Sequence, residues 1–335
     1  KPDSPRSGSD ASGEVNMETE FIIQHGGGIY LPTVQDGVKL TTERRNTPGK
    51  LTFKVLNDDV LDFTEGDPVR FTVGGTKMFY GFVFTKSRSG DGAISVTAYD
   101  QLRYLKNKDT FTAEGLKASE LTKRLANDFN LNTGTIEDTG YAIGTIVEEN
   151  QTLFDMIGNA LDETLLNTGK LFVLYDDCGE LTLKNIASMK LDLLIDAETA
   201  GDFSYSSSID SQTYNKIKLA YNNDKTGKRE IFAAKDSANI SQFGVLQYFE
   251  EVKTQTGAAA KAESLLRLYD RRTRSLTVKN AFGDPRVRAG CQIAVNLNLG
   301  DIIVKNFMVV EQVTHSFSGG IHTMDMTLIG GDFVA

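Results

Sequence analysis

The sequence predicts a mainly β protein in which two related β barrels or sandwiches flank a small α/β domain. Near both ends of the chain, short runs of β-branched and aromatic residues alternate with glycine-rich turns. The middle of the chain has apolar residues at helical spacing instead. One order of strands and turns also occurs twice, which indicates a divergent duplication.

The repeated pattern runs over residues 65–100 and again over 284–333. Each copy has a glycine-led strand, a long apolar strand, a turn rich in Ser and Gly, and a strand in which apolar and polar residues alternate. Each copy is therefore expected to form a β-meander at the centre of one β domain. The leading and turn glycines are Gly66 and Gly92 in the first copy and Gly290 and Gly320 in the second.

Changes of composition divide the chain into four segments. Residues 1–16 are polar and rich in Ser, Gly, Asp and Pro, and are expected to be a disordered arm or a remnant of cloning that precedes a native Met17. The other three segments are a first β domain over 17–108, an α/β insertion over 109–204 and a second β domain over 205–335.

Apolar periodicity and capping residues predict the helices and one hairpin of these domains. The expected elements are a helix with the apolar stripe Leu121, Leu125 and Phe129, a helix capped by Asn150 or Thr152 and ended by Gly169, a hairpin over 171–186, and a helix over 257–272.

Composition excludes several classes of protein. Charged residues make up 24% of the chain and apolar residues 40%, as in soluble globular proteins, and no apolar run is long enough to span a membrane. The net charge of −9 without a basic block argues against tight binding of nucleic acid, but allows nucleic acid to pass nearby. Cys178 and Cys291 fit a reducing compartment, in which a disulfide between them is not expected.

Two histidines form the most interesting candidate site. His315 and His322 flank the Ser318-Gly319 turn, so hairpin pairing would set them opposite each other on one face. Glu311 lies on the same strand and offers a third ligand for a metal ion. A cross-strand polar pair near a turn is the favoured interpretation.

Other candidates also favour structural interpretations. His25 has no Cys or Ser motif near it, and neither cysteine sits in a nucleophile signature. No GxSxG, HExxH, Walker or Rossmann pattern is present. No catalytic, cofactor-binding or metal-binding residue is therefore assigned, no cofactor is expected, and the chain is predicted to be no enzyme.

Three further sets of residues are candidate sites. The carboxylate pairs lie in turns or at helix starts, where adjacent side chains point apart, which disfavours a glycosidase-like pair. The triple glycine favours a hairpin turn over a phosphate loop. The arginines at the end of the helix predicted over 257–272 either complement the helix dipole or bind phosphate. These sets are Asp58-Asp59, Glu148-Glu149 and Asp176-Asp177; Gly26-Gly27-Gly28; and Arg271, Arg272 and Arg274.

Several long strings resemble one protein family. They are AYDQLRYLKNKDTF (98–111), NTGKLFVLYDDCGELTLKNI (167–186), DFSYSSSIDSQTYNKIKLAY (202–221), FGDPRVRAGCQIAV (282–295) and HTMDMTL (322–328). They are similar to the baseplate hub proteins of contractile phage tails, tail-like bacteriocins and PBSX-like prophages, in particular the XkdQ or YqbQ family. The resemblance covers residues 21–333 and leaves 1–16 unmatched.

The resemblance implies a homotrimer whose chains each carry two tail-tube-like domains. Six like β units would then form a ring that adapts a trimeric central spike to the six-fold tail tube, and repeat one would meet repeat two of the next chain. The implied partners are the tail tube protein, the central spike, and the baseplate wedge and tape-measure proteins. The implied place is the baseplate of a virion or tail-like particle, assembled in the bacterial cytoplasm without membrane insertion.

Two rival functions remain at the level of sequence. A peptidoglycan hydrolase is the first, because some relatives carry that label, although the residues here do not support it. A carbohydrate-binding β module is the second, and the absence of Trp disfavours it.

The hub interpretation also predicts the character of a central channel. DNA is expected to pass through it without specific binding, because a cationic lining would hold DNA by releasing counterions. We therefore expect a neutral to negative lumen, with Arg271, Arg272 and Arg274 facing away from it. An ordinary acidic surface unrelated to a channel is the alternative.

Overall fold

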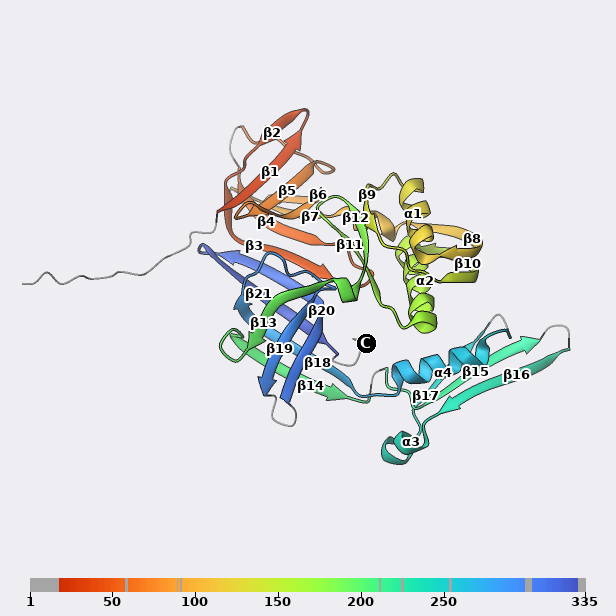
Figure 1. Ribbon diagram of the computed structural model, residues 1–335. Coiled ribbons are helices and arrows are strands. Elements are labelled where there is room, and N and C mark those ends of the chain that lie inside the picture. The colour runs from red at the N-terminus through yellow and green to blue at the C-terminus, as the bar shows by residue number, and fades with distance from the viewer. Residues whose placement is uncertain are drawn as a thin grey trace, which may run out of the picture.

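The computed structural model describes residues 18–57, 60–88, 90, 92–210, 212–223, 226–252, 255–298 and 303–330. The expectations for residues 1–16 and for the Asp58-Asp59 pair lie outside this part of the chain. β-Strands dominate the described residues, which confirms the predicted mainly β class (Figure 1). Within them, no helix is both long and apolar enough to cross a membrane.

The N-terminal part folds into an antiparallel sheet that wraps around one apolar core. Its strands alternate as predicted: in the fourth strand Leu51, Phe53 and Val55 are buried while Lys50 and Lys54 are exposed. The strands are β1 (Thr19–His25), β2 (Gly28–Tyr30), β3 (Val34–Glu43), β4 (Lys50–Leu56), β5 (Pro68–Val73), β6 (Thr76–Arg88) and β7 (Ala93–Tyr99).

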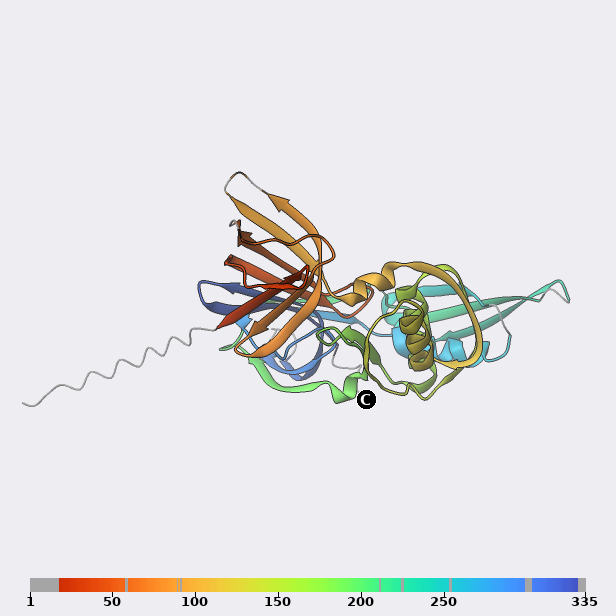
Figure 2. The ribbon, with the colours of Figure 1, turned by 90° about the horizontal axis from the view of Figure 1, so that it is seen from above.

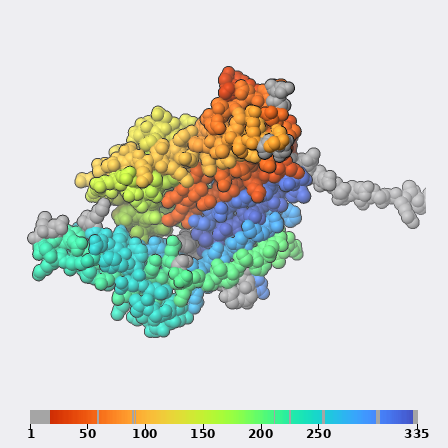
Figure 3. All heavy atoms as spheres, turned by 180° about the vertical axis from the view of Figure 1, so that it is seen from behind, coloured from red at the N-terminus to blue at the C-terminus, as the bar shows by residue number. Residues whose placement is uncertain are grey.

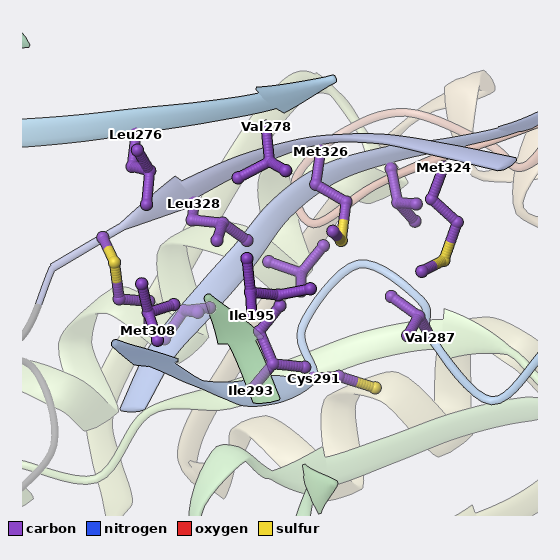
Figure 4. Close-up of a cluster of buried hydrophobic side chains, with 14 of the residues drawn as sticks. Ile195, Leu276, Val278, Val287, Cys291, Ile293, Met308, Met324, Met326 and Leu328 are labelled. Atoms are coloured by element: carbon purple, nitrogen blue, oxygen red, sulfur yellow. The ribbon is translucent and has the colours of Figure 1, made fainter. Parts of the chain in front are cut away.

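The C-terminal part builds a second sheet unit around a core of aliphatic side chains and methionines (Figure 4). Figure 4 shows Leu276, Val278 and Met326 converging on Ile195 and Ile293 from the facing strands. The strands are β13 (Lys190–Asp196), β14 (Asp202–Ser208), β18 (Thr273–Phe282), β19 (Gln292–Asn298), β20 (Ile303–Ser318) and β21 (Ile321–Ile329).

The two units are repeats of one strand order, as the sequence predicts. Repeat 1 has the order β3-β4-β7-β6-β5-β1, and repeat 2 has β14-β18-β21-β20-β19-β13. In both, a glycine with φ near +95°, Gly66 or Gly290, precedes the first meander strand. Gly66 donates its N–H to the Val83 carbonyl and Gly290 to that of Val310, each at 2.8 Å. A β-bulge directly follows both valines, so the repeats agree in detail.

One difference between the repeats lies at the last strand. β1 pairs antiparallel with β5, whereas β13 pairs parallel with β19. The predicted barrel or sandwich takes the form of open sheets, because none of the four sheets of the described residues closes on itself.

A direct strand pair joins the repeats into one sheet (Figures 1 and 2). One edge of β20 pairs with β19 over residues 303–309 and then with β3 over 312–317, while β21 occupies the opposite edge. β3 of repeat 1 is thus the neighbour of β20 of repeat 2. Figure 3 shows the two repeats stacked against each other on this side of the molecule.

The α/β insertion, which lies between the repeats along the chain, forms a separate core. Leu121 and Leu125 are buried as predicted, Thr152 caps the second helix by accepting the Asp155 N–H at 3.1 Å, and Gly169 ends it at φ +70°. The elements are η1 (Gln101–Lys106), β8 (Lys108–Lys117), α1 (Ala118–Asp128), β9 (Thr133–Ile136), β10 (Ala142–Thr152), α2 (Leu153–Thr168), β11 (Phe172–Asp176), β12 (Leu181–Asn185) and η2 (Ile186–Ser188).

A second insertion lies between β14 and β18, where repeat 1 has only a short connection. One face of its small mixed sheet packs on its long helix, as Figure 1 shows. The long helix confirms the one predicted over 257–272, but the short helix and the parallel strand were not predicted. The elements are β15 (Lys216–Asn223), β16 (Lys228–Lys235), α3 (Ser237–Phe243), β17 (Gln247–Glu251) and α4 (Ala258–Tyr269).

Strand pairing bears on where the domains divide. The sequence placed a boundary between residues 204 and 205, yet β13 pairs with β19 and β14 with β18 inside the large sheet. We therefore propose a boundary near residue 189, with 209–272 as a second insertion into repeat 2.

Replacing Gly81 with alanine is expected to destabilise repeat 1. A Cβ at Gly81 would lie 2.3 Å from the Tyr99 carbonyl oxygen, and backbone of the neighbouring strand cannot move aside cheaply. We expect a loss of about 1–3 kcal/mol in the free energy of unfolding, measured by urea denaturation. Gly144→Ala is the matched control, because nothing lies within 4 Å of its Cβ position. Equal stability of the two variants would contradict the prediction.

Candidate functional site: a shared polar face and buried polar clusters

A polar face runs across both repeats opposite their apolar cores. Strand alternation places hydroxyl side chains on it: Thr52 pairs with Thr97 in repeat 1, and Thr277 with Thr327 in repeat 2. At the seam between the repeats, the Thr41 and Thr314 hydroxyls hydrogen-bond at 3.0 Å. The face is therefore continuous from one repeat to the next.

At the polar-face positions of β3, β4, β14, β18 and β21, cations and carboxylates are nearly balanced. Lys279 pairs with Asp325 at 3.1 Å, and exposed Glu43 lies beside the seam. Arg274 stands on the opposite face of β18, and the Arg272 guanidinium lies 5.2 Å from the centre of the Phe243 ring. The charged side chains at polar-face positions of β3, β4, β14, β18 and β21 are Lys39, Glu43, Lys50, Lys54, Asp202, Lys279 and Asp325.

A depression of about 650 Å³ marks the seam on the polar face. Thr41 and Thr314 lie in it. Cations come from Lys50, Arg103 and Lys106, and a carboxylate comes from Glu43. The depression thus combines hydroxyls with charges of both signs, which suits contact with a polar surface better than a defined reaction.

The two histidines lie buried beside the seam and contact each other. His315 Nδ1 and His322 Nε2 are 2.8 Å apart, and His315 Nε2 lies 2.9 Å from the Val287 carbonyl oxygen. Because a carbonyl only accepts, His315 carries its proton on Nε2 and accepts from His322 Nε2–H. His322 Nδ1 is then unprotonated and buried, and it has no hydrogen-bond partner in the described part of the chain.

The predicted hairpin register of these histidines was wrong. His315 pairs with Met324, and His322 pairs with Phe317, so the two rings are diagonal neighbours rather than opposite each other. The reason is the turn: Ser318 pairs with Ile321, which leaves only Gly319 and Gly320 between the strands. The side chains still meet, because diagonal positions share one face of the hairpin.

Burial and contact keep both rings neutral. Burial, followed by the charge of His322, lowers the pKa of His315 to about 3. Burial lowers the pKa of His322 to about 4, against an opposing effect of Asp284. Glu311 was the candidate third metal ligand, but it forms an ion pair with Arg44 at 2.6 Å. Among the described residues, no three His, Cys, Asp or Glu side chains are grouped for metal binding.

A second polar cluster joins repeat 1, repeat 2 and the α/β insertion. Asp100 is buried and accepts N–H groups from Gly49 at 2.9 Å and Leu102 at 3.1 Å. Burial, and then the charge of Asp176, raise the pKa of Asp100 well above its ordinary value. Arg288 contacts the turn that contains Asp176, because its guanidinium donates a hydrogen bond to the Asp176 carbonyl oxygen at 3.2 Å. This cluster ties three segments together, and the sequence analysis did not identify Asp100 or Arg288.

The remaining candidate residues are not brought together. Burial raises the pKa of Cys178 to about 11 and raises that of Cys291, which makes both thiols poor nucleophiles, and both cysteines are free. Glu148 accepts a hydrogen bond from Asn159 at 3.0 Å. His25 lies 2.8 Å from Asp67.

The triple glycine occupies a tight turn between two strands. Gly26 and Gly27 lie in the turn between β1 and β2 with positive φ, which confirms the predicted hairpin. Backbone in this left-handed region favours glycine, so the turn explains these residues without a bound phosphate.

The fold defined by these repeats is that of phage tail proteins of known structure. The 43 kDa tail protein of prophage MuSo2 from Shewanella oneidensis aligns over 94% of this chain and 100% of its own, with a TM-score of 0.71 and 15% identity. The E. coli c3393 protein, a type VI secretion component described as similar to the T4 tail proteins gp27 and gp5, aligns over 92% of this chain and 76% of its own. Its TM-score is 0.55 at 11% identity. Identities this low show a shared fold alone.

The chain belongs to the YQBQ-like family, whose model matches residues 38–329. It is 32% identical to the uncharacterized protein YqbQ of Bacillus subtilis (strain 168) over 313 residues, covering 90% of this chain and 93% of that protein. It is 29% identical to the phage-like element PBSX protein XkdQ of the same strain, covering 90% of this chain and 94% of that protein. The resemblance found in the sequence is thereby confirmed.

Proposed function

We propose that this protein is a structural baseplate hub of a contractile tail. The observation that supports this proposal best is the pairing of β3 with β20, which joins two repeats of the same strand order edge to edge. A chain built this way supplies two successive units of a ring. Three chains would supply six, matching a six-fold tube above and a trimeric spike below.

In this proposal the polar face lines the channel of the ring. Hydroxyl side chains such as Thr52, Thr97 and Thr277 carry no charge, and the lysines at the polar-face positions of β3, β4 and β18 are nearly matched by carboxylates. Few counterions would therefore be released, and DNA would slide without specific binding. The nearly balanced charges at the polar-face positions of β3, β4, β14, β18 and β21 support a lumen close to neutral there, and the position of Arg274 on the other face agrees with this.

The other proposed partners follow from the ring. The tail tube protein would stack on one rim and the central spike on the other, while the two insertions would reach outward to the baseplate wedge. The tape-measure protein would pass along the axis with DNA. The place of action is the baseplate of a virion or tail-like particle, after assembly in the bacterial cytoplasm.

A peptidoglycan hydrolase is supported less well. Asp176 is the buried member of the Asp176-Asp177 pair, and its carboxylate accepts hydrogen bonds from Gln101 and Gly179 at 2.8 and 2.7 Å. These bonds hold the turn between β11 and β12, so Asp176 has a structural role that does not require a substrate.

Stoichiometry tests the hub proposal directly. Light scattering of the concentrated chain, of 36.7 kDa per copy, and microscopy of the assembled tail are expected to give three copies per particle. A single copy in the assembled tail would contradict the proposal. Turnover of purified peptidoglycan that is lost in Asp176→Ala or Asp177→Ala would favour the hydrolase instead.

A further inference from the structure

The strand pair that joins the two repeats, β3 with β20, is not repeated elsewhere in the described part of the large sheet. In repeat 2, the second half of β20 pairs with β3 on the edge that β19 leaves free. In repeat 1, the equivalent strand β6 pairs with β5 only up to Phe82, and over residues 85–88 it pairs with β7 alone. The β5-side edge of 85–88 therefore has no strand partner among the described residues.

The equivalent of β3 also has an open edge. β14 occupies in repeat 2 the place of β3 in repeat 1, and it is the terminal strand of the large sheet. Its outer edge carries no strand within the described residues. The chain thus has an open edge at β14, the equivalent of β3, and another at the second half of β6, the equivalent of β20. Unpaired edges of this kind are templates for another chain.

The exposure of equivalent residues also indicates that the outer edge of β14 is open. The strands β3, β4 and β7 of repeat 1 pair in the same register as β14, β18 and β21 of repeat 2. Val38 is therefore equivalent to Phe203, and Leu40 is equivalent to Tyr205. Where β20 covers the edge, Val38 is 5% exposed and Leu40 is 3% exposed. At the open edge Phe203 is 37% exposed and Tyr205 is half-buried. The open edge therefore carries apolar surface that its covered equivalent buries.

We propose that β14 pairs antiparallel with the second half of β6 of another copy of this chain, in the register of the β3–β20 pair. This inference rests on the proposed hub and adds its contact between chains. Thr41 lies opposite Thr314 within the chain, and the equivalent pair between chains is Ser206 opposite Ser87. Thr85 then lies opposite Ser208, and Arg88 opposite Tyr205.

This register joins the polar faces of neighbouring copies. Ser206 and Ser208 share the side of β14 that carries the polar face, and Thr85 and Ser87 share that side of β6. A shift by one residue would turn every side chain to the opposite face, so the polar face would no longer be continuous. The contact is head to tail, because two different edges meet, and it closes into a ring or continues as a filament.

Cysteine cross-linking tests the register. The Thr41 and Thr314 side chains touch, so the double variant Ser87→Cys/Ser206→Cys is expected to form disulfides between chains under mild oxidation. Bands at multiples of 36.7 kDa should appear on non-reducing gels and disappear with reductant. The matched control is Ser87→Cys/Ser207→Cys, because Ser207 points to the opposite face of β14; it and both single variants should stay uncrosslinked.

The outcomes separate this inference from the proposed function. Cross-linked trimers as the largest species would support both. A ladder beyond three copies would support the register and contradict the closed trimer. Trimers by light scattering that cross-link only in the Ser207 variant, or in neither variant, would overturn the register and leave the hub intact. A chain that stays monomeric at every concentration would overturn the register.

Discussion

Phe317→Ala is expected to lower the free energy of unfolding by about 3–5 kcal/mol, the range for removing a buried aromatic ring. Phe317 belongs to β20 of repeat 2, yet its ring lies in the core of repeat 1. Its ring centre is 5.1 Å from that of Phe71 and 4.2 Å from that of His322. Removing the ring leaves a cavity at the seam, so the variant should loosen the junction between the repeats.

The chain offers a matched control for this change. Phe282 lies on β18 of the same repeat but is 76% exposed, so Phe282→Ala should change stability by less than about 0.5 kcal/mol. Urea denaturation of both variants measures the difference. Native-state hydrogen exchange should also speed up along β3 and β20 in Phe317→Ala. Similar losses in the two variants would show that Phe317 does not hold the repeats together.

Acid is expected to destabilise the protein below about pH 6.5, the ordinary pKa of histidine. Both His315 and His322 have folded-state pKa values below this, about 3 and about 4. Above pH 6.5 both rings are neutral in the folded and unfolded states, and their contribution is complete. As the pH falls from 6.5 towards 4 and 3, the unfolded chain takes up protons that the folded chain refuses. The loss for His315 at pH 4 is on the order of 3 kcal/mol.

The dependence of stability on pH tests this directly. Denaturant unfolding from pH 7 to pH 4.5 measures how steeply the free energy of unfolding falls. His322→Phe removes one titrating ring and keeps the stacking on Phe317, so the slope should decrease by about one proton per molecule. The slope is informative even if the variant is less stable at every pH. An unchanged slope would mean that His322 is not shielded from protonation in the folded chain.

Much of the fold could be predicted because its signals are local. Alternating apolar residues define the meander strands, and glycines that adopt positive φ punctuate both copies at equivalent places. The start of α2 at Thr152 and its end at Gly169 could be predicted for the same reason, because a helix cap depends on a few neighbouring residues. A further local signal was missed: Leu51-Thr52 in β4 and Leu276-Thr277 in β18 occupy equivalent positions and extend the repeat beyond the meander.

The second insertion could not be predicted in the same way. Its parallel pair, β15 with β17, brings together segments separated by β16 and α3, and its alternation resembles that of the repeat itself. Periodicity shows that a strand exists and which face is apolar, but not which strand it joins. The same limit explains why β13 and β14 were placed outside the second β domain or at its margin.

The sequence alone established the duplicated meander, the three longer helices of the insertions, the lack of a catalytic motif and the family resemblance. Only the tertiary structure decided that β3 pairs with β20, that His315 and His322 meet diagonally, and that Asp100 is buried beside Asp176. These features join residues far apart along the chain or depend on the length of one turn. Local pattern sets which face of a strand is buried, whereas register and strand partners arise when the edges of the whole sheet are matched.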